Sequence, residues 1–460
     1  MQSFIITKEI MENRFDPFYY KPEYRNLISN LTKRTKNIKR LGELADFSKE
    51  RWDKSKWQGD IFRYIEINRI DIVTGKIQQA SMMEVKKSPS RAQMFLRKGD
   101  IIISTTRPYR GAIAIIPDKF DKSIGSTGFS ILRNMHEKVN KKYLFFILRS
   151  NIGLKQMEQR MSGGNYPAIT EEELAKIFIP LPPCQIQDKI ADIMNEAYKK
   201  QREMLDKSEK ILSSIEPYLL KELDIIIPSC DEKKKFMLGF DNLRNNRYDV
   251  HYHQPKYEKM EDAITNSKYE VKLLGEIVDF SSTQINPEDT PEKKFKYIEI
   301  EHVNDKIGQI TGHSEINGKD APSRARMLLH TGDLLISSLQ GSLGSIAIVP
   351  MELDNSIGTT GFLIISMGKK VNNIFLWGLL RSSIYQSLIT REATGAIMAA
   401  VTQSQLAKIK IPFPPFSVQN QIANEINFRQ KEAEKFCFEA EKVMEEAKQK
   451  FEKIALGEIK

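Results

Sequence analysis

The 460-residue chain contains only three cysteines, and they lie far apart. Cys184, Cys230 and Cys437 form no C-x-x-C pair, which argues against a zinc site and against a disulfide framework. No apolar run reaches the ~18 residues that a membrane helix needs. The N-terminus has no basic segment followed by an apolar core, so no secretory signal is predicted. These absences predict a cytoplasmic protein that does not engage a membrane.

The sequence also lacks the short motifs of common catalytic folds. It contains no G-x-x-x-x-G-K-[ST] phosphate loop and no G-x-G loop after a strand. The stretch "FPPF" at 413–416 superficially resembles the Asn/Asp-Pro-Pro-aromatic motif of adenine methyltransferases, whose first residue must accept a hydrogen bond from the target amino group. Phe413 takes that place here, and Leu181 takes it before the other double proline. We therefore expect no catalytic residues, no metal site and no enzymatic activity.

The chain carries more positive than negative charge. The formal net charge is +10 and the isoelectric point is about 9.1. This excess favours an anionic partner, and nucleic acid first.

The two halves of the chain repeat each other at a shift of 233 residues. The stretch "SPSRAQMFLRKGDIIIS" at 88–104 matches "APSRARMLLHTGDLLIS" at 321–337. The shift becomes 232 where "LFFILRS" at 144–150 matches "LWGLLRS" at 376–382. The alignment of the two halves therefore needs only one single-residue deletion, which indicates that the halves arose by duplication. The sequence therefore predicts an internal pseudo-twofold repeat.

Each half has the same order of predicted elements. Several short apolar runs typical of strands come first, followed by a helical stretch, a glycine-containing loop, and a strand that ends on a double proline. A long helix follows each double proline. We therefore expect an α+β protein with two mixed α/β domains at 1–183 and 225–415, and with helical spacers at 184–224 and 416–460.

The double prolines explain how each globular domain would meet its helix. The two joints read "KIFIPLPPCQIQDKIADI" at 176–193 and "KIKIPFPPFSVQNQIANEI" at 408–426. Proline has no backbone N–H for a further strand ladder, yet it is tolerated at a helix start. Apolar residues then follow at 4/3 spacing, as a coiled coil requires. We expect the two helices to pair antiparallel as a rod of roughly 50 Å, with one domain at each end.

The residues predicted to form the seam between the two helices are Ile190, Met194, Ala197, Met204, Ile211, Ile215, Ile422, Ile426, Ala433, Phe436, Ala440, Val443 and Ala447. The helical segments 187–224 and 419–460 carry net charges of −2 and −1, so the rest of the chain carries about +13. This division suits a rod that contacts protein and globular domains that meet a phosphate backbone. Lysines scattered over the surface remain the simpler alternative.

The paired joints "IPLPPCQIQDKI" and "IPFPPFSVQNQI", together with the "GD-hydrophobic-S" strands at 99–104 and 332–337, resemble the specificity subunit of type I restriction–modification systems. The resemblance covers nearly all of the chain. One departure is that family members often carry an acidic residue before the glutamine of the joint, whereas this chain has Ile186 and Val418 there.

The resemblance implies two target-recognition domains, each reading one half of a split sequence in double-stranded DNA. It also implies that the helices separate the domains and bind two methyltransferase subunits, and that restriction subunits with motor and nuclease activity join this core. S-adenosylmethionine, ATP and Mg²⁺ would then serve the partners, and this chain would bind none of them. The target bases, the spacer length and the subunit stoichiometry do not follow from the sequence.

Comparison of the halves suggests which residues touch DNA. If the halves read different bases, divergent residues carry specificity and shared residues contact the backbone. Two pairs of aligned loops diverge: "TTRPYRG" at 105–111 against "SLQGSLG" at 338–344, and "SKERWDKSKWQGD" at 48–60 against "SSTQINPEDTPEK" at 281–293. They supply the base-reading candidates Arg51, Trp52, Lys54, Arg107, Tyr109, Arg110, Gln284, Asn286, Gln340 and Ser342. The shared residues Ser90, Arg91, Ser323 and Arg324 are the backbone candidates.

Simpler explanations stay open for all of these residues. The divergent loops could be solvated surface, and the shared Ser-Arg pairs could be structural turns with the arginine buried against a carboxylate. At the level of the whole chain, a DNA enzyme with an unrecognised active site and a coiled-coil scaffold that binds no nucleic acid are the competing hypotheses. Activity of the purified chain would favour the first, and salt-dependent duplex binding would exclude the second.

Overall fold

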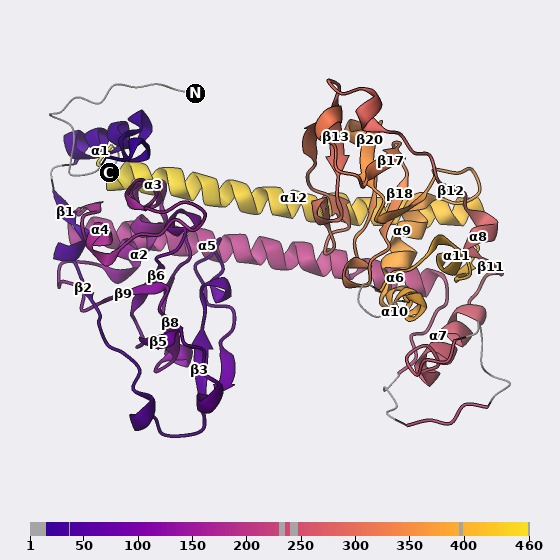
Figure 1. Cartoon of the computed structure of the whole chain (residues 1–460), viewed down its shortest axis with the longest axis horizontal. Helices are drawn as coiled ribbons and strands as arrows, with labels where there is room; N and C mark the ends of the chain where they lie inside the picture. Colours follow the sequence, from indigo (N-terminus) through magenta and orange to yellow (C-terminus); the bar gives the residue numbers. More distant parts are fainter. Residues whose placement is uncertain (1–14, 36, 230–234, 240–246, 395–398, 459–460) are drawn as a thin grey trace. The chain divides into compact units, whose positions relative to one another are not determined.

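The structure of the protein is a computed structural model, and it divides into two compact units (Figure 1). Unit 1 comprises Met1–Met204 with Phe438–Lys460, and unit 2 comprises Leu205–Cys437. The residues that the structure describes are 15–35, 37–229, 235–239, 247–394 and 399–458. Cys230 and part of the second glycine-containing loop, residues 395–398, lie outside the described residues.

Unit 1 contains two four-stranded sheets. The first has the order β2-β9-β6-β7 with antiparallel neighbours throughout. The second has the order β4-β3-β8-β5, in which only β3 and β8 run parallel. The strands are β2 (Asp46–Phe47), β3 (Ile61–Ile65), β4 (Ser81–Glu84), β5 (Ala92–Phe95), β6 (Ile101–Ser104), β7 (Ile113–Ile115), β8 (Ile124–Ser126) and β9 (Phe129–Arg133).

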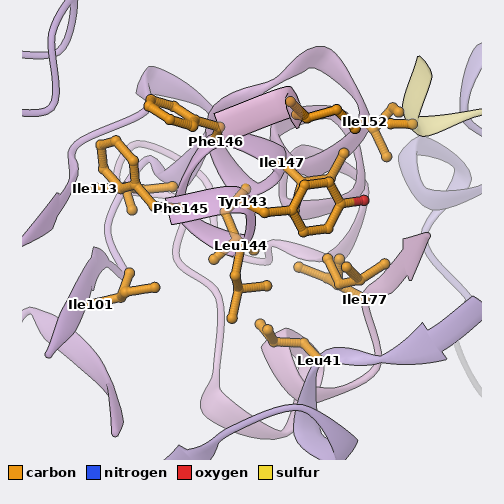
Figure 2. Packing of buried hydrophobic residues seen from close by; sticks show 14 of the residues in the cluster. Leu41, Ile101, Ile113, Tyr143, Leu144, Phe145, Phe146, Ile147, Ile152 and Ile177 are labelled. Carbon is orange, nitrogen blue, oxygen red and sulfur yellow. The ribbon is translucent and has the colours of Figure 1, made fainter. Parts of the chain in front are cut away.

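Helix α2 (Lys141–Arg149) supplies the centre of the core of unit 1. Its six residues from Tyr143 to Leu148 are all buried, and they pack with Ile101 of β6 and Ile113 of β7 (Figure 2). The other elements of the unit are α1 (Pro22–Arg34), α3 (Asn151–Arg160), α4 (Glu171–Ala175) and the antiparallel pair β1 (Ile38–Arg40) and β10 (Phe178–Pro180). Strand β10 carries the chain to the first double proline.

Unit 2 has the same two strand orders, β12-β21-β18-β19 and β16-β13-β20-β17, again with a single parallel pair, β13 and β20. The strands are β12 (Phe280–Ser281), β13 (Lys294–Ile298), β16 (Ser314–Asn317), β17 (Ala325–Leu329), β18 (Leu334–Ser337), β19 (Ile346–Ile348), β20 (Ser356–Thr359) and β21 (Phe362–Ile365). The remaining elements include α7 (Pro255–Thr265), α8 (Leu274–Ile277), α9 (Asn373–Arg381), α10 (Ser383–Glu392), α11 (Gln403–Leu406), the small pair β14 (Val303–Asn304) and β15 (Gln309–Ile310), and the pair β11 (Val271–Leu273) and β22 (Lys410–Pro412). The expectation of mixed helix and sheet in two sheet-containing domains is thus confirmed.

A long helix begins directly after each double proline, and a buried glutamine holds each start in place. Helix α5 (Cys184–Ser213) follows Pro183, and Gln187 is 1% exposed. Its Oε1 accepts from the backbone N–H of Asn140 at 2.8 Å, and its Nε2 donates to the carbonyls of Lys138 and Pro182 at 3.0 and 2.8 Å. Because Asn140 caps the N-terminus of α2, one side chain ties the joint to the core helix.

The second joint repeats this arrangement inside unit 2. Helix α12 (Phe416–Ala455) follows Pro415, and Gln419 is fully buried. Its Oε1 accepts from the N–H of Asn372, the cap of α9, and its Nε2 donates to the carbonyl of Pro414, both at 2.9 Å. The glutamine of each joint is therefore a structural residue.

The long helices pack against each other within each unit. In unit 2, the Ser208 hydroxyl lies 3.3 Å from the Cys437 sulfur, and Arg429 donates to the carbonyl of Ser214 at 2.7 Å. Residue numbers rise on one helix as they fall on the other, so the helices run antiparallel there. Helix α6 (Ile215–Glu222) continues from α5.

Most of the predicted seam residues are buried. Ile190, Met194, Ala197, Ile215, Ile422, Ile426, Ala433, Ala440 and Ala447 are buried, whereas Met204, Ile211, Phe436 and Val443 are partly exposed. Near the end of α12 the buried face includes Met444 and Phe451, which the 4/3 spacing did not select. A helix of 3.6 residues per turn drifts away from a strict seven-residue repeat, which accounts for this shift. Among the described residues, no helix is both long and apolar enough to cross a bilayer.

Candidate nucleic-acid interface

Three turns of unit 1 meet at one end of its two sheets. Loop 105–111 leaves the end of β6, and the N–H and hydroxyl of Thr105 donate to the carbonyl of Gly128 at 2.8 and 3.0 Å. Beside Gly128, the N–H of Thr127 donates to the carbonyl of Arg91 at 2.8 Å. The shared Ser90-Arg91 turn and the divergent loop after β6 therefore lie on the same edge of the unit.

Unit 2 builds the same edge with the same bonds. The N–H and hydroxyl of Ser338 donate to the carbonyl of Gly361, both at 2.9 Å. The N–H of Thr360 donates to the carbonyl of Arg324 at 2.9 Å. The backbone scaffold is thus common to both units, while the side chains on loop 105–111 and loop 338–344 differ.

The glycine-containing loop of each unit completes this edge. The N–H of Arg107 donates to the carbonyl of Pro167, and the N–H of Gln340 donates to the carbonyl of Ala399, both at 2.8 Å. Arg107 and Gln340 thus occupy equivalent places, one in each unit. Arg107 has a φ of 47°, a left-handed conformation that is uncommon for a residue with a Cβ. The surrounding backbone bonds hold it there.

The side chains of the divergent loops differ in availability. Arg110 and Gln340 are exposed, and Arg107 and Tyr109 are half-buried. The hydroxyl of Ser342 lies 2.7 Å from that of Ser337 and is half-buried, so it is engaged within the protein.

The shared Ser-Arg pairs lie on the surface. Ser90, Arg91, Ser323 and Arg324 are all exposed. The alternative in which the arginine is buried against a carboxylate therefore does not describe this structure, although the backbone of each pair does form a structural turn. Exposed guanidinium groups on such an edge are suited to phosphate contacts.

The second pair of divergent loops includes one residue that the prediction placed wrongly. Trp52 is only 8% exposed and packs in a cluster with Phe62 and Tyr64, because the main chain runs beside β5 and turns this side chain inward. The Trp52 ring is therefore part of the apolar packing under this loop and is not exposed to a base. Lys54 is exposed, with its Nζ 5.4 Å from the centre of the Trp52 ring.

The other candidates of these loops are exposed, with varied engagement. Arg51 pairs with Met94 through its main chain, and its guanidinium donates to the Met94 sulfur. Gln284 is exposed, and its main chain pairs with Met327 at the equivalent place of unit 2. Asn286 is exposed, with its Nδ2 donating to Asp289 at 2.9 Å.

An arginine on the core helix of each unit anchors the divergent loop, and the sequence comparison did not single it out. Arg149 of α2 donates to the carbonyls of Gly111 and Val73, both at 2.8 Å. Arg381 of α9 donates to the carbonyl of Gly344 at 3.2 Å, and burial lowers its pKa to about 10. The sequence signal for this residue was the shared "LRS" of the two halves, where an arginine ends a run of apolar residues in each helix.

The units also differ in the charges at the opposite ends of these strands, where β5 and β9 end and β6 begins. In unit 1, Arg97 donates to both oxygens of Glu50, at 2.9 and 2.7 Å, and Arg133 bonds both Glu50 and Asp100. Hydrogen bonds from Arg97, and then from Arg133, hold the pKa of Glu50 at about 2. In unit 2 the residue aligned with Asp100 is Asp333, and burial raises the pKa of its carboxyl.

Comparison with known proteins places the chain in a family. The family model described as the type I restriction modification DNA specificity domain matches residues 33–216 and 266–427, which is well over half of the chain. Each of the two matched segments contains the edge described above, once in each unit.

Individual relatives agree with the family model. The MjaX specificity subunit of Methanocaldococcus jannaschii is 26% identical over 376 residues, which are 78% of this chain and 79% of that protein. The HindI specificity subunit of Haemophilus influenzae is 27% identical over 156 residues, spanning 34% of this chain and only 33% of that protein.

A solved structure has a similar fold. A chain from a study of the assembly and conformational transition of the type I R-M system aligns with a TM-score of 0.51 at 23% identity, covering 91% of this chain and 96% of that one. The resemblance noted in the sequence is confirmed: the chain belongs to the type I restriction–modification specificity family, whose members are the non-catalytic specificity subunits of those systems.

Proposed function

We propose that this protein reads a bipartite DNA sequence, with one unit for each half-site and an unread spacer between them. The observation that carries the proposal is the repeated edge, in which the same backbone bonds hold a shared exposed arginine beside a divergent loop. Contacts to phosphates position a protein on DNA, whereas contacts to base edges specify the sequence. Arg91 and Arg324 would make the phosphate contacts.

Base reading falls to the divergent loops. Arg107 and Arg110 of unit 1 are cations that can form paired hydrogen bonds to guanine, and Gln340 of unit 2 is an amide that can do so to adenine. Different side chains on one scaffold would let the two units recognise different half-sites. Arg51, Lys54 and Gln284 would add contacts from the second loops.

The long helices would form an antiparallel coiled coil that docks two methyltransferase subunits, with restriction subunits joining that assembly. The helical segments are almost neutral overall, and α12 exposes Phe428 and Phe438 at 61% and 68%. Exposed aromatic side chains on a helix are suited to anchoring a protein partner. S-adenosylmethionine, ATP and Mg²⁺ would be used by those partners.

Mapping methyladenine in the genome of cells with and without the gene tests the proposal. We expect a single bipartite motif to lose its methylation when the gene is deleted and to regain it on complementation. An unchanged methylation map, in cells that retain the methyltransferase subunits, would contradict the proposal. A contiguous motif would contradict the division into half-sites alone.

A further inference from the structure

The glycine-containing loop of unit 1 lies directly against the loop that carries Arg107. Residues Ser162 and Ala168 pair with each other, and Ala168 also pairs with Thr106. These bridges, together with the bond from the Arg107 N–H to the Pro167 carbonyl, tie loop 162–168 to loop 105–111 through the backbone. Side chains from both loops therefore share one surface.

The Arg107 side chain reaches from its own loop to the glycine-containing loop. Its Nη2 donates to the carbonyl of Asn165 at 3.0 Å, and its guanidinium carbon lies 5.3 Å from the centre of the Tyr166 ring. Tyr166 is 77% exposed, which is unusual for a large aromatic residue. A guanidinium within about 6 Å of an aromatic ring is attracted by its electron-rich face.

The arrangement belongs to the part of the unit that differs between the halves. The aligned loops read "SGGNYPA" at 162–168 and "TGAIMAA" at 394–400, so Met398 is aligned with Tyr166 and Gln340 with Arg107. The arginine and the aromatic residue beside it are therefore both replaced in the second half of the sequence. Under the proposed division between shared and divergent residues, a divergent pair indicates a contribution to specificity.

We propose that Tyr166 is a positioning residue for base recognition, which holds the Arg107 guanidinium in the orientation that pairs with one guanine of the first half-site. A free arginine side chain samples many rotamers, whereas one that rests on a ring and bonds a carbonyl is pre-organised for two parallel hydrogen bonds. The two loops form one reading unit. This inference rests on the proposed DNA-reading function.

The test uses the complex assembled with its methyltransferase subunits, and duplexes that carry each of the four bases at every position of the first half-site. Arg107→Ala should reduce discrimination at one guanine by roughly 5- to 140-fold. Tyr166→Ala should reduce discrimination at that same base by roughly 2- to 5-fold. Tyr166→Phe should retain it, because the ring and not the hydroxyl holds the guanidinium.

The double variant identifies a shared pathway. If Tyr166 acts through Arg107, the pair Arg107→Ala with Tyr166→Ala should discriminate no worse than Arg107→Ala alone. The matched control is Tyr248→Ala, which removes an equally exposed tyrosine of unit 2 (74%) and should leave the first half-site unchanged.

Three results would overturn the inference. Tyr166→Ala could leave discrimination at the Arg107 base unchanged, it could relax a different base, or its loss could add in full to that of Arg107→Ala. A wild-type complex that modifies DNA without any sequence preference would instead contradict the proposed function, and the inference with it. The wild-type profile therefore separates the two failures.

Discussion

Arg91 and Arg324 are equivalent exposed residues whose carbonyls hold the same turn in each unit. If they contact phosphates, each releases about one counterion from the duplex. We expect Arg91→Ala to weaken binding to all sequences and to reduce the slope of log affinity against log salt by about one. Binding of the assembled complex at several salt concentrations measures this slope.

Arg324→Ala is the matched variant, and it should change the slope by the same amount without altering either half-site. An Arg91→Ala variant that keeps its salt slope and relaxes one base position would mean that the shared turn reads sequence and the divergent loop does not.

Glu50 predicts a pH dependence of stability. Bonds from Arg97 and Arg133 hold its pKa at about 2 in the folded state, below its ordinary value of 4.5. A carboxyl with a lowered folded pKa stabilises the fold above its unfolded pKa, and this contribution is lost as the pH falls from about 4.5 to about 2. Because the carboxylate is one-third exposed, we expect roughly 1 kcal/mol at neutral pH after screening by solvent.

Denaturant unfolding of the wild-type protein and of Glu50→Gln at pH 7 and near pH 3 measures this contribution. The free-energy difference between the two proteins should be present at pH 7 and should shrink on acidification. A difference that grows as the pH falls would contradict the assigned ion pairs. Glu43→Gln is a control, since its carboxylate is bonded by Lys39 at a more exposed place outside this network.

At the scale of elements, the joint between strand and helix depends on one buried amide. Gln187 makes hydrogen bonds to Asn140, Lys138 and Pro182 and is almost fully buried. Gln187→Leu keeps the bulk of the side chain but leaves buried backbone groups without partners. We expect unfolding to become easier by about 1–3 kcal/mol, as measured by thermal or denaturant unfolding.

Gln185→Leu provides the control, because Gln185 lies two residues earlier on the same helix and is exposed. It should change stability by less than about 0.5 kcal/mol. Equal effects of the two substitutions would show that the joint is held by the prolines and by apolar packing alone.

Elements were more predictable than the surroundings of individual side chains. Proline pairs and capping residues act within a few positions of the chain, so the starts of both long helices could be predicted from the amino-acid sequence. The side of Trp52 could not, because its burial depends on the main chain lying beside β5. The anchoring role of Arg149 likewise depends on a loop almost 40 residues away in sequence, at Gly111.

At the scale of the molecule, each unit has its own pair of sheets and its own apolar clusters. Base contacts in one unit should therefore be independent of those in the other. We expect that exchanging residues 14–183 for the matching domain of another specificity subunit will change one half-site and preserve the second. Methylation mapping of the exchanged protein provides the measurement.

The donor domain should carry an asparagine at the place of Asn140, so that the bond from its Nδ2 to the Asp188 carboxylate at the start of α5 is kept. Assembly with the methyltransferase subunits controls for folding of the exchanged protein. A change in both half-sites at once would contradict the assignment of one half-site to each unit.

The repeat of the two halves, the mixture of helix and strand, and the family could be recognised from the residues alone, because these depend on periodicity, local turn chemistry and motif spacing. Which candidate residues reach the surface, and which loops share an edge, depends on the folded chain. Hydrogen bonds such as those from Arg107 to Asn165 and Pro167 join positions nearly 60 residues apart. Burial likewise depends on how the whole chain packs, so neither can be predicted from the local sequence.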